Sequence, residues 1–400
     1  MKYDFTSIID RHGQDASAVD NIVDRGMGPR VMPEDYDPIP MWVADMNFPC
    51  YPGITAQMAK RLEHPTFGYF PPREEYYDRI INWQRVRNGV TGLTKENIGY
   101  ENGVLGGVVS ALNVFCSKGA PVLVHNPLYV GFSGILNNNG YKIVASDLVP
   151  DENDILRMDF DDMEKKIVEN KIHAAIICNP HNPAGRVWER WELEKAMELF
   201  AKYDVYVVSD EIWSDIIMPG YKHIPTQSVS EDAKMRTVAF YAPSMTFNLA
   251  GLVGSYHIIY NKYLNDRILK QSSLCHYNSM NVLSMHALIG AFDEGGMEWV
   301  DELTRVIQGN IDCVAEALSK YPGVHVRKAQ GTYMLFVDFT DWMKAHGIDQ
   351  DELMHRGWDA GVVWQDGRRF YAPGHIRMNL ASPLSRIQEA MRRLDKVLGA

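Results

Sequence analysis

The stretch Val205-Tyr-Val-Val-Ser-Asp-Glu-Ile-Trp213 is the most informative about the fold, because a continuous, mostly apolar run is followed in it by two acidic residues. Strands buried on both faces of a parallel sheet have such unbroken runs, whereas half-exposed strands alternate apolar and polar residues. Four further runs have the same character. They cover residues 122–125, 174–178, 237–241 and 256–260. The sequence therefore predicts a largely parallel sheet.

Helical patterns lie between these runs. In residues 189–203, apolar side chains recur at helical spacing on one face; they are Leu193, Ala196, Met197 and Phe200. This alternation of strands and helices predicts an α/β fold in which helices cover the sheet.

The last third of the chain has a different pattern. An amphipathic stripe runs from Leu303 to Leu318, a strand pattern covers 331–338, and a helical pattern runs from Ile387 to Val397. These elements predict a small α+β unit. The expected division is a large domain at 46–285 and a small domain made of 1–45 and 286–400.

The composition excludes some classes of partner. The 400 residues carry a formal charge of −11, which argues against nucleic acid or an anionic membrane as the main partner. The N-terminus lacks a signal-peptide core, and no apolar run reaches the roughly 18 residues of a membrane span, so we expect a cytoplasmic protein. The cysteines are five, widely spaced and without a metal-ligand pattern, so we expect no metal site.

Glycines precede an apolar helical run in Asn102-Gly-Val-Leu-Gly-Gly-Val-Val-Ser110. Glycine lets the backbone approach a ligand closely, and a helix N-terminus offers N–H groups to an anion. The segment fits either a phosphate site or an ordinary turn into a helix, and taken alone it favours the turn.

Two further segments follow predicted strands, at the edge where parallel sheets bind ligands. In Cys178-Asn-Pro-His-Asn-Pro-Ala-Gly-Arg186 the prolines restrict the loop, so Asn182 either donates to a ligand oxygen or caps a turn. Asp210 ends its strand, and a buried acid needs a cation, either a protein side chain or a protonated ligand nitrogen. Residues 241–251 also follow a strand but by composition are only a loop.

In this order, the segments resemble those of fold-type I pyridoxal 5'-phosphate (PLP) enzymes of the aminotransferase superfamily, in particular the MalY/PatB-like carbon–sulfur β-lyases. The resemblance extends over nearly the whole chain. It is carried by residues 40–49, 67–69, 126–132, 179–186, 209–212, 244–251 and 377–383. It implies a mainly parallel sheet of the seven-stranded type, an N-terminal segment packed on the small domain, and a homodimer with shared active sites. The implied reaction releases a thiol, pyruvate and ammonia from L-cystathionine or a related cysteine S-conjugate.

The resemblance also implies roles for individual residues in binding the cofactor ring. Asp210 would pair with the pyridine nitrogen, Asn182 would hold the phenolic oxygen, and Tyr129 would stack on the ring. Asp210 and Tyr129 would also take part in catalysis.

The phosphate and the substrate have their own implied residues. The backbone of Gly103 and Val104, together with Ser244, would bind the phosphate. Tyr69 would reach the phosphate of the neighbouring subunit. Arg377 would bind the substrate carboxylate, alongside Asn182; the alternative for Arg377 is a surface ion pair.

One position departs from the family pattern Ser-Lys-Thr-Phe-Asn-Leu-Ala-Gly, because Met245 stands where the lysine is expected. That lysine binds the cofactor covalently and then moves the α-proton, and a thioether can do neither. We therefore expect this form to be inactive or very slow. Met245 fits either an engineered substitution that disables an otherwise active lyase, or a natural pseudoenzyme that holds PLP, or its amine form, noncovalently as a regulatory or binding protein.

Smaller departures bear on substrate choice. Asn47 replaces a common aspartate, Trp213 a common histidine and Leu384 a common arginine of the family. Within enzymes, the alternative to a lyase is a PLP-dependent aminotransferase, because both share the same cofactor residues.

Overall fold

The computed structural model describes residues 1–274 and 278–399, and its larger unit is built on a mixed sheet in the order β2-β9-β8-β7-β6-β3-β4-β5. The strands are β2 (Ile98–Glu101), β3 (Pro121–Asn126), β4 (Lys142–Pro150), β5 (Leu156–Met158), β6 (Ala174–Cys178), β7 (Tyr206–Asp210), β8 (Thr237–Tyr241) and β9 (Ser255–Ile258). The pairs from β8 through β4 are parallel, whereas β2–β9, β8–β9 and β4–β5 are antiparallel. The predicted parallel sheet is confirmed, although it has eight strands rather than seven.

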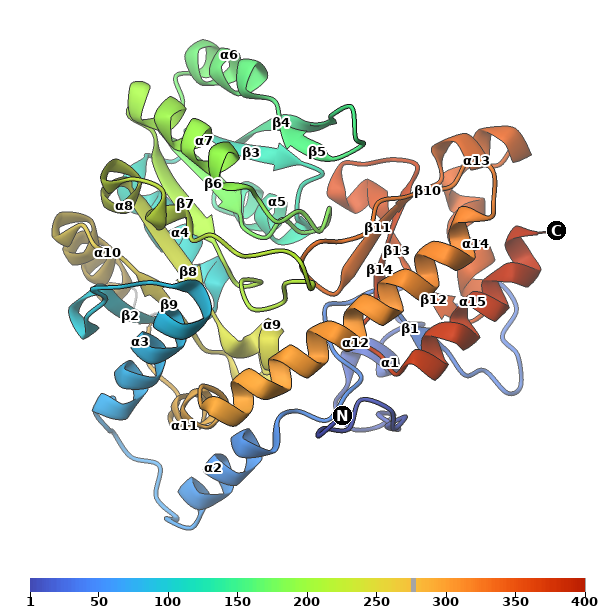
Figure 1. Ribbon diagram of the computed structural model, residues 1–400, viewed down its shortest axis with the longest axis horizontal. Helices are drawn as coiled ribbons and strands as arrows, with labels where there is room; N and C mark the ends of the chain where they lie inside the picture. Colours follow the sequence, from blue (N-terminus) through green and yellow to red (C-terminus); the bar gives the residue numbers. More distant parts are fainter. Residues whose placement is uncertain (275–277, 400) are drawn as a thin grey trace.

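Helices cover both faces of this sheet (Figure 1). One face carries α4 (Val104–Phe115), α5 (Val130–Asn138) and α10 (Lys262–Leu274); the other carries α6 (Phe160–Asn170), α7 (Arg190–Lys202) and α8 (Glu231–Arg236). Within β6, Ala174 and Ile176 pack into the first layer, and Ala175 and Ile177 pack into the second. Burial on both faces explains why the strand sequences are apolar without alternation.

A second sheet forms the smaller unit and is antiparallel, in the order β10-β11-β14-β13. Its strands are β10 (His325–Val326), β11 (Met334–Asp338), β13 (Gln365–Asp366) and β14 (His375–Asn379). Its helices are α13 (Thr340–His346), α14 (Gln350–Asp359) and α15 (Leu384–Leu398).

A long helix connects the two units (Figure 1). α12 (Glu294–Ser319) has 26 residues and follows α11 (Val282–Ala291). At about 1.5 Å per residue, such a helix is about 39 Å long. The division of the chain into domains stays a prediction, and its boundary at 285–286 lies within α11, which packs on α2 (Pro52–Leu62).

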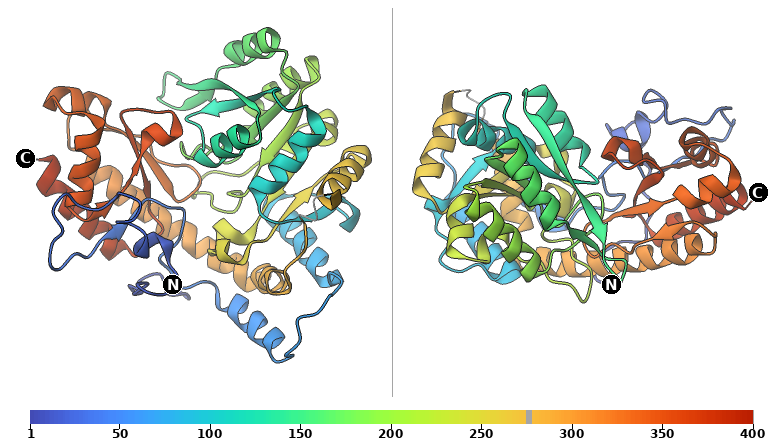
Figure 2. Two further views of the ribbon diagram at one scale, coloured as in Figure 1. Left: turned by 180° about the vertical axis from the view of Figure 1, so that it is seen from behind. Right: turned by 90° about the horizontal axis from the view of Figure 1, so that it is seen from above.

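The N-terminal segment packs on the smaller unit, as expected (Figure 2). β1 (Ile39–Pro40) pairs in parallel with β12 (Val362–Val363), and Arg30 forms ion pairs with Glu352 and Asp359. The remaining elements are α1 (Ser17–Asp20), α3 (Glu74–Asn88), α9 (Pro243–Phe247) and the 3-10 helices Lys95–Asn97, Thr226–Ser228, Ala250–Leu252 and Gly367–Phe370.

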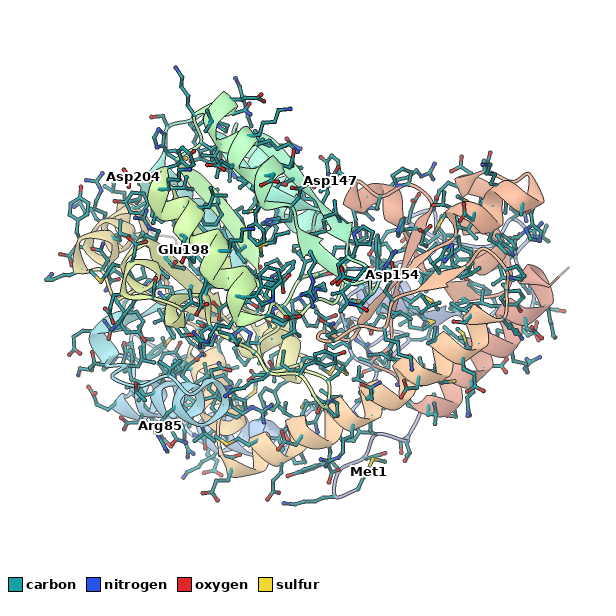
Figure 3. All side chains as sticks on the ribbon, turned by 45° about the horizontal axis from the view of Figure 1, so that its top comes forward. Met1, Arg85, Asp147, Asp154, Glu198 and Asp204 are labelled. Carbon is teal, nitrogen blue, oxygen red and sulfur yellow. The ribbon has the colours of Figure 1, made fainter. Side chains whose placement is uncertain are left out.

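The two units also meet through side chains. Asp154, labelled in Figure 3 where the units approach each other, pairs with Arg327 at 2.6 Å. No helix within the described residues combines the length and apolar character needed to cross a bilayer.

Candidate active site

A cavity of about 320 Å³ lies at the carboxyl ends of β6, β7 and β8. Parallel strands bring their carboxyl ends to one edge of a sheet, so residues far apart in the chain meet there. Most of the predicted site residues line it: Gly103, Val104, Tyr129, Asn182, Asp210, Ser244 and Met245. Trp213 also lines the cavity. The sequence therefore predicted which segments come together.

Two adjacent acids at the end of β7 have opposite surroundings. Glu211 is fully buried and accepts hydrogen bonds from the Tyr241 hydroxyl at 2.7 Å and from His223 Nε2 at 2.8 Å. Asp210 is also buried, but only the N–H of Ile212 bonds to it, at 3.1 Å, and no cation of the described residues pairs with it. Burial raises the pKa of Asp210 to about 7. Its carboxylate is thus open to a cationic group bound in the cavity.

The segment before α4 forms one end of the cavity. Gly103 has φ +85° and precedes the first residue of α4, Val104. Residues 102–106 line the cavity together with Ser244 from the start of α9. The first N–H groups of a helix have no acceptor within the helix, so this end suits an anion. The segment is therefore a turn into a helix, as predicted, and the same turn can also form a phosphate site.

An aromatic ring forms another wall. Tyr129 directly precedes α5, and burial raises the pKa of its phenol. A Cβ at Gly131 would lie 2.4 Å from the Tyr129 ring, so glycine there leaves room for the ring. The ring borders a cavity that a flat heterocycle could enter.

Arg377, on β14, is buried and contacts the cavity through Asn182. Its Nη1 donates to Asn182 Oδ1 at 3.1 Å, and its Nη2 donates to the carbonyl of Trp42 at 3.1 Å. Among the described residues, Nε has no hydrogen-bond partner and no carboxylate pairs with this guanidinium. Burial lowers the pKa of Arg377 to about 10. The alternative of a surface ion pair is therefore wrong, and the side chain is placed to receive an anion.

Asn182 uses its two ends differently. Its oxygen accepts from Arg377, which leaves the amide nitrogen as the donor for a ligand in the cavity. The alternative of a local cap by this oxygen does not occur, because Arg377 is a distant partner in the chain.

Met245 lies on α9 and is half-buried at the cavity. The hydroxyl of Tyr333 lies 3.7 Å from its sulfur, and the ring centroids of Tyr333 and Trp213 are 4.6 Å apart in a T-shaped arrangement. Thr246 fixes α9 by donating to Asp215 at 3.0 Å. No lysine is among the described residues that line the cavity.

Comparison with known proteins identifies the family. Residues 44–394 match the model of the aminotransferase class I and II family. The chain belongs to this family. Among its relatives, the cystathionine beta-lyase PatB of Bacillus subtilis is 34% identical over 366 residues, covering 90% of this chain and 93% of that protein.

Two solved structures show the same aminotransferase fold. Cystalysin of Treponema denticola, which contains a pyridoxal 5'-phosphate cofactor, is 31% identical, with a TM-score of 0.91 and coverage of 100% of this chain and 99% of that chain. The PLP-bound C–S lyase of Staphylococcus hominis is 29% identical, with a TM-score of 0.89 and the same coverage. Both likenesses extend through the two units.

The cavity of this aminotransferase-family chain fits most parts of a PLP molecule. A buried carboxylate without a cation suits a protonated ring nitrogen, and the start of α4 with Ser244 suits a phosphate. The covalent attachment point does not fit, because residue 245 ends in a thioether. The residues present therefore fit a cofactor that is held by noncovalent contacts.

Tyr69 and Arg377 are the predicted site residues that do not line the cavity, and Tyr69 lacks the link that Arg377 has through Asn182. Tyr69 lies between α2 and α3, and its side chain is fully exposed.

Two of the positions that depart from the family pattern are also placed by the structure. Asn47 accepts a hydrogen bond from Arg11 at 3.1 Å, and Leu384 begins α15 with an exposed side chain.

Residue-level reasoning missed a buried polar cluster behind the cavity. Glu101 and His257 are both fully buried, and Glu101 Oε1 lies 2.7 Å from His257 Nδ1. The signal in the sequence is His257 itself, because it interrupts the apolar run at 256–260.

Proposed function

We propose that this chain has the site of a PLP-dependent carbon–sulfur β-lyase, acting on L-cystathionine or a related cysteine S-conjugate, and that Met245 disables it. The observation that carries the proposal is the pair of buried, opposite charges, Asp210 and Arg377, which lack protein counter-ions among the described residues. Relatives named as cystathionine and C–S lyases support the choice of reaction.

The proposed residues divide the work of binding. Bound PLP supplies a ring that accepts electrons from the substrate. Asp210 would keep a proton on the ring nitrogen, Tyr129 would stack on the ring, and Asn182 would donate to its phenolic oxygen. The backbone of 103–104 and the Ser244 hydroxyl would bind the phosphate.

Arg377 would orient the substrate. Its guanidinium can bind the α-carboxylate with two N–H groups, which fixes the substrate in one direction. Trp213, which lines the cavity, and Tyr333, beside Met245, would then lie near the substrate side chain.

Met245 removes two contributions at once. A thioether has no amine to bind the cofactor covalently, and it carries no proton to move to or from the substrate. General acid–base catalysis is typically worth about 10²–10⁴-fold in rate. The chain as it stands is thus expected to bind cofactor and turn over very slowly or not at all.

The test is pyruvate release from L-cystathionine with PLP present, measured side by side for the chain with Met245, Met245→Lys and Met245→Gln. We expect activity only in the lysine variant, because glutamine has similar length but no basic amine. If the lysine variant binds PLP without releasing pyruvate, the lyase proposal fails. Amino transfer to a keto acid that exceeds pyruvate release would instead favour an aminotransferase.

A second candidate is a regulatory protein that binds PLP or its amine form. Met245 favours it, because a thioether allows only noncovalent contacts to the cofactor. The other proposed cofactor residues that line the cavity favour instead a lyase with an engineered, disabling substitution. Cofactor affinity without turnover in both the chain with Met245 and Met245→Lys would support this function.

We also propose that the protein forms a homodimer with shared active sites and that it is cytoplasmic. Tyr69 and Phe67 lie exposed on the segment between α2 and α3, where a second copy could cover them. Tyr69 would then reach the neighbour's phosphate.

Free thiols among the described residues support a reducing compartment; they are Cys50, Cys116, Cys178 and Cys313.

A further inference from the structure

The segment that leads into α4 is supported from behind by a buried carboxylate. Glu101 is the last residue of β2, has no exposed surface, and directly precedes residues 102–103 at the cavity. A buried carboxylate is costly unless it is hydrogen-bonded, so its partners are fixed parts of the structure.

His257 is the first partner. Its Nδ1 lies 2.7 Å from Glu101 Oε1, and β9 places it opposite Gly99 on β2. A Cβ at Gly99 would lie 2.2 Å from the imidazole ring, so only glycine leaves room for the ring there. The ring is therefore confined against β2 and holds the carboxylate in place.

Asn278 is the second partner, from the segment that follows α10. Its Nδ2 donates to Glu101 Oε2 at 2.7 Å and to the Ser272 hydroxyl at 3.0 Å. Its Oδ1 accepts from the N–H of Asn102 at 3.0 Å. One side chain thus connects α10, the buried carboxylate and the first residue of the cavity segment.

This arrangement fixes the direction of the backbone. With the N–H of Asn102 bound to Asn278, the chain turns through Gly103 at φ +85° into α4. The first-turn N–H groups of α4 then meet the cavity at the end that suits a phosphate.

We propose that Asn278, held by Glu101 and His257, is a positioning residue for phosphate binding. It orients the backbone of residues 102–104 without touching the ligand. The inference rests on the proposed function, because it takes the PLP phosphate as the group bound there. It requires a selective effect, in which affinity for the phosphorylated ligand falls and affinity for the same ligand without phosphate does not.

The test compares dissociation constants for PLP and for pyridoxal in the full chain. Asn278→Ala is expected to weaken PLP binding roughly tenfold and to change pyridoxal binding less than twofold, because a loss of about 1.4 kcal/mol is confined to the phosphate. Asn265→Ala is the matched control. Asn265 lies on α10 and donates to the carbonyl of Glu96 at 2.9 Å, away from the cavity segment. Its removal should leave both constants unchanged.

An exchange of partners gives a second test. Asn278→Asp alone should weaken PLP binding, because two carboxylates would then face each other. Adding Glu101→Gln should restore it, because glutamine can donate to the new carboxylate while that carboxylate still accepts from Asn102. Failure of the double variant to recover would overturn the positioning role.

The outcomes separate this inference from the proposed function. If the chain with Met245 and no further substitution binds no PLP, the proposed function fails. If it binds PLP and Asn278→Ala binds it equally well, or if PLP and pyridoxal weaken by the same factor, only the positioning role fails. Amide hydrogen exchange in the ligand-free protein reports on the segment itself. Exchange at residues 102–104 should be faster in Asn278→Ala, and unchanged exchange would contradict the inference.

Discussion

Asp210 lowers the stability of the ligand-free protein, although its carboxylate is placed to bind a cationic group. Burial raises its pKa from 3.8 to about 7, so the folded protein keeps a proton that the unfolded chain has already lost between these pH values. Its contribution to stability therefore falls as the pH rises through this window. The full difference corresponds to about 4 kcal/mol above pH 7.

Asp210→Asn should consequently stabilise the ligand-free protein, and more so at high pH. We expect the gain in the free energy of unfolding to be larger at pH 8 than at pH 5 by roughly 2–3 kcal/mol. Urea unfolding of both proteins at the two pH values measures this gain. A gain that is the same at both pH values would show that ionisation of Asp210 is not its source.

Arg377 permits a second prediction at this scale. Its guanidinium is buried and has no carboxylate partner in the described part of the chain. Arg377→Lys should therefore weaken binding of L-alanine to the PLP-loaded protein by about tenfold or more, since lysine cannot form the bidentate pair. L-Alaninamide, which lacks the carboxylate, is the matched ligand. Calorimetric titration should show a much smaller loss for the amide, and equal losses would place the carboxylate elsewhere.

At the scale of elements, α4 lies so close to the sheet that one methyl group matters. A Cβ at Gly107 would lie 2.4 Å from the Phe240 ring on β8, whereas a Cβ at Gly134 on α5 would meet nothing within 4 Å. Gly107→Ala should destabilise the protein by about 1–3 kcal/mol through overpacking. Gly134→Ala should stabilise it by up to about 1 kcal/mol through helix propensity. Opposite shifts of the urea midpoint are the expected result, and shifts of the same sign would contradict the packing argument.

The strands were predicted with accurate bounds where every residue of the strand is buried. The runs at 174–178 and 237–241 form β6 and β8 with the predicted bounds, because strands buried on both faces are apolar at every position. β4 was not predicted, since its nine residues alternate irregularly between buried and exposed. β5 has only three residues and exists because it pairs with β4.

The candidate site was predictable in part for a related reason. Its segments follow strands or precede helices, so the sequence shows where they lie, and the resemblance supplies their roles. The support behind it was not predictable. Glu101 meets His257 only because β2 pairs with β9 in the register that sets Gly99 opposite His257, and sequence patterns do not determine such a register.

At the scale of the whole molecule, the shared-site proposal makes a prediction about mixed dimers. Sedimentation should show a particle of twice the 45.5 kDa chain mass. Tyr69→Ala should weaken PLP binding about tenfold, the cost of one hydrogen bond to a charged group, although the residue lies outside its own cavity.

Mixing subunits distinguishes a shared site from a general defect. In a dimer of one Tyr69→Ala chain and one Asp210→Ala chain, the first cavity is intact and receives Tyr69 from its partner. We therefore expect one tight site per mixed dimer, whereas neither parent dimer has any. Mixed dimers that bind no better than their parents would rule out sharing.

Met245 has a consequence for how the protein would respond to the concentration of free cofactor. Without an amine at residue 245, every contact to the cofactor is reversible, and loading follows mass action. Ligand at 100 times its dissociation constant adds about 2.7 kcal/mol to the stability of a folded protein. Thermal resistance would then rise and fall with the surrounding concentration of free cofactor. A lyase with lysine keeps its cofactor through the covalent bond, whereas the cofactor occupancy of this chain would follow the free cofactor concentration.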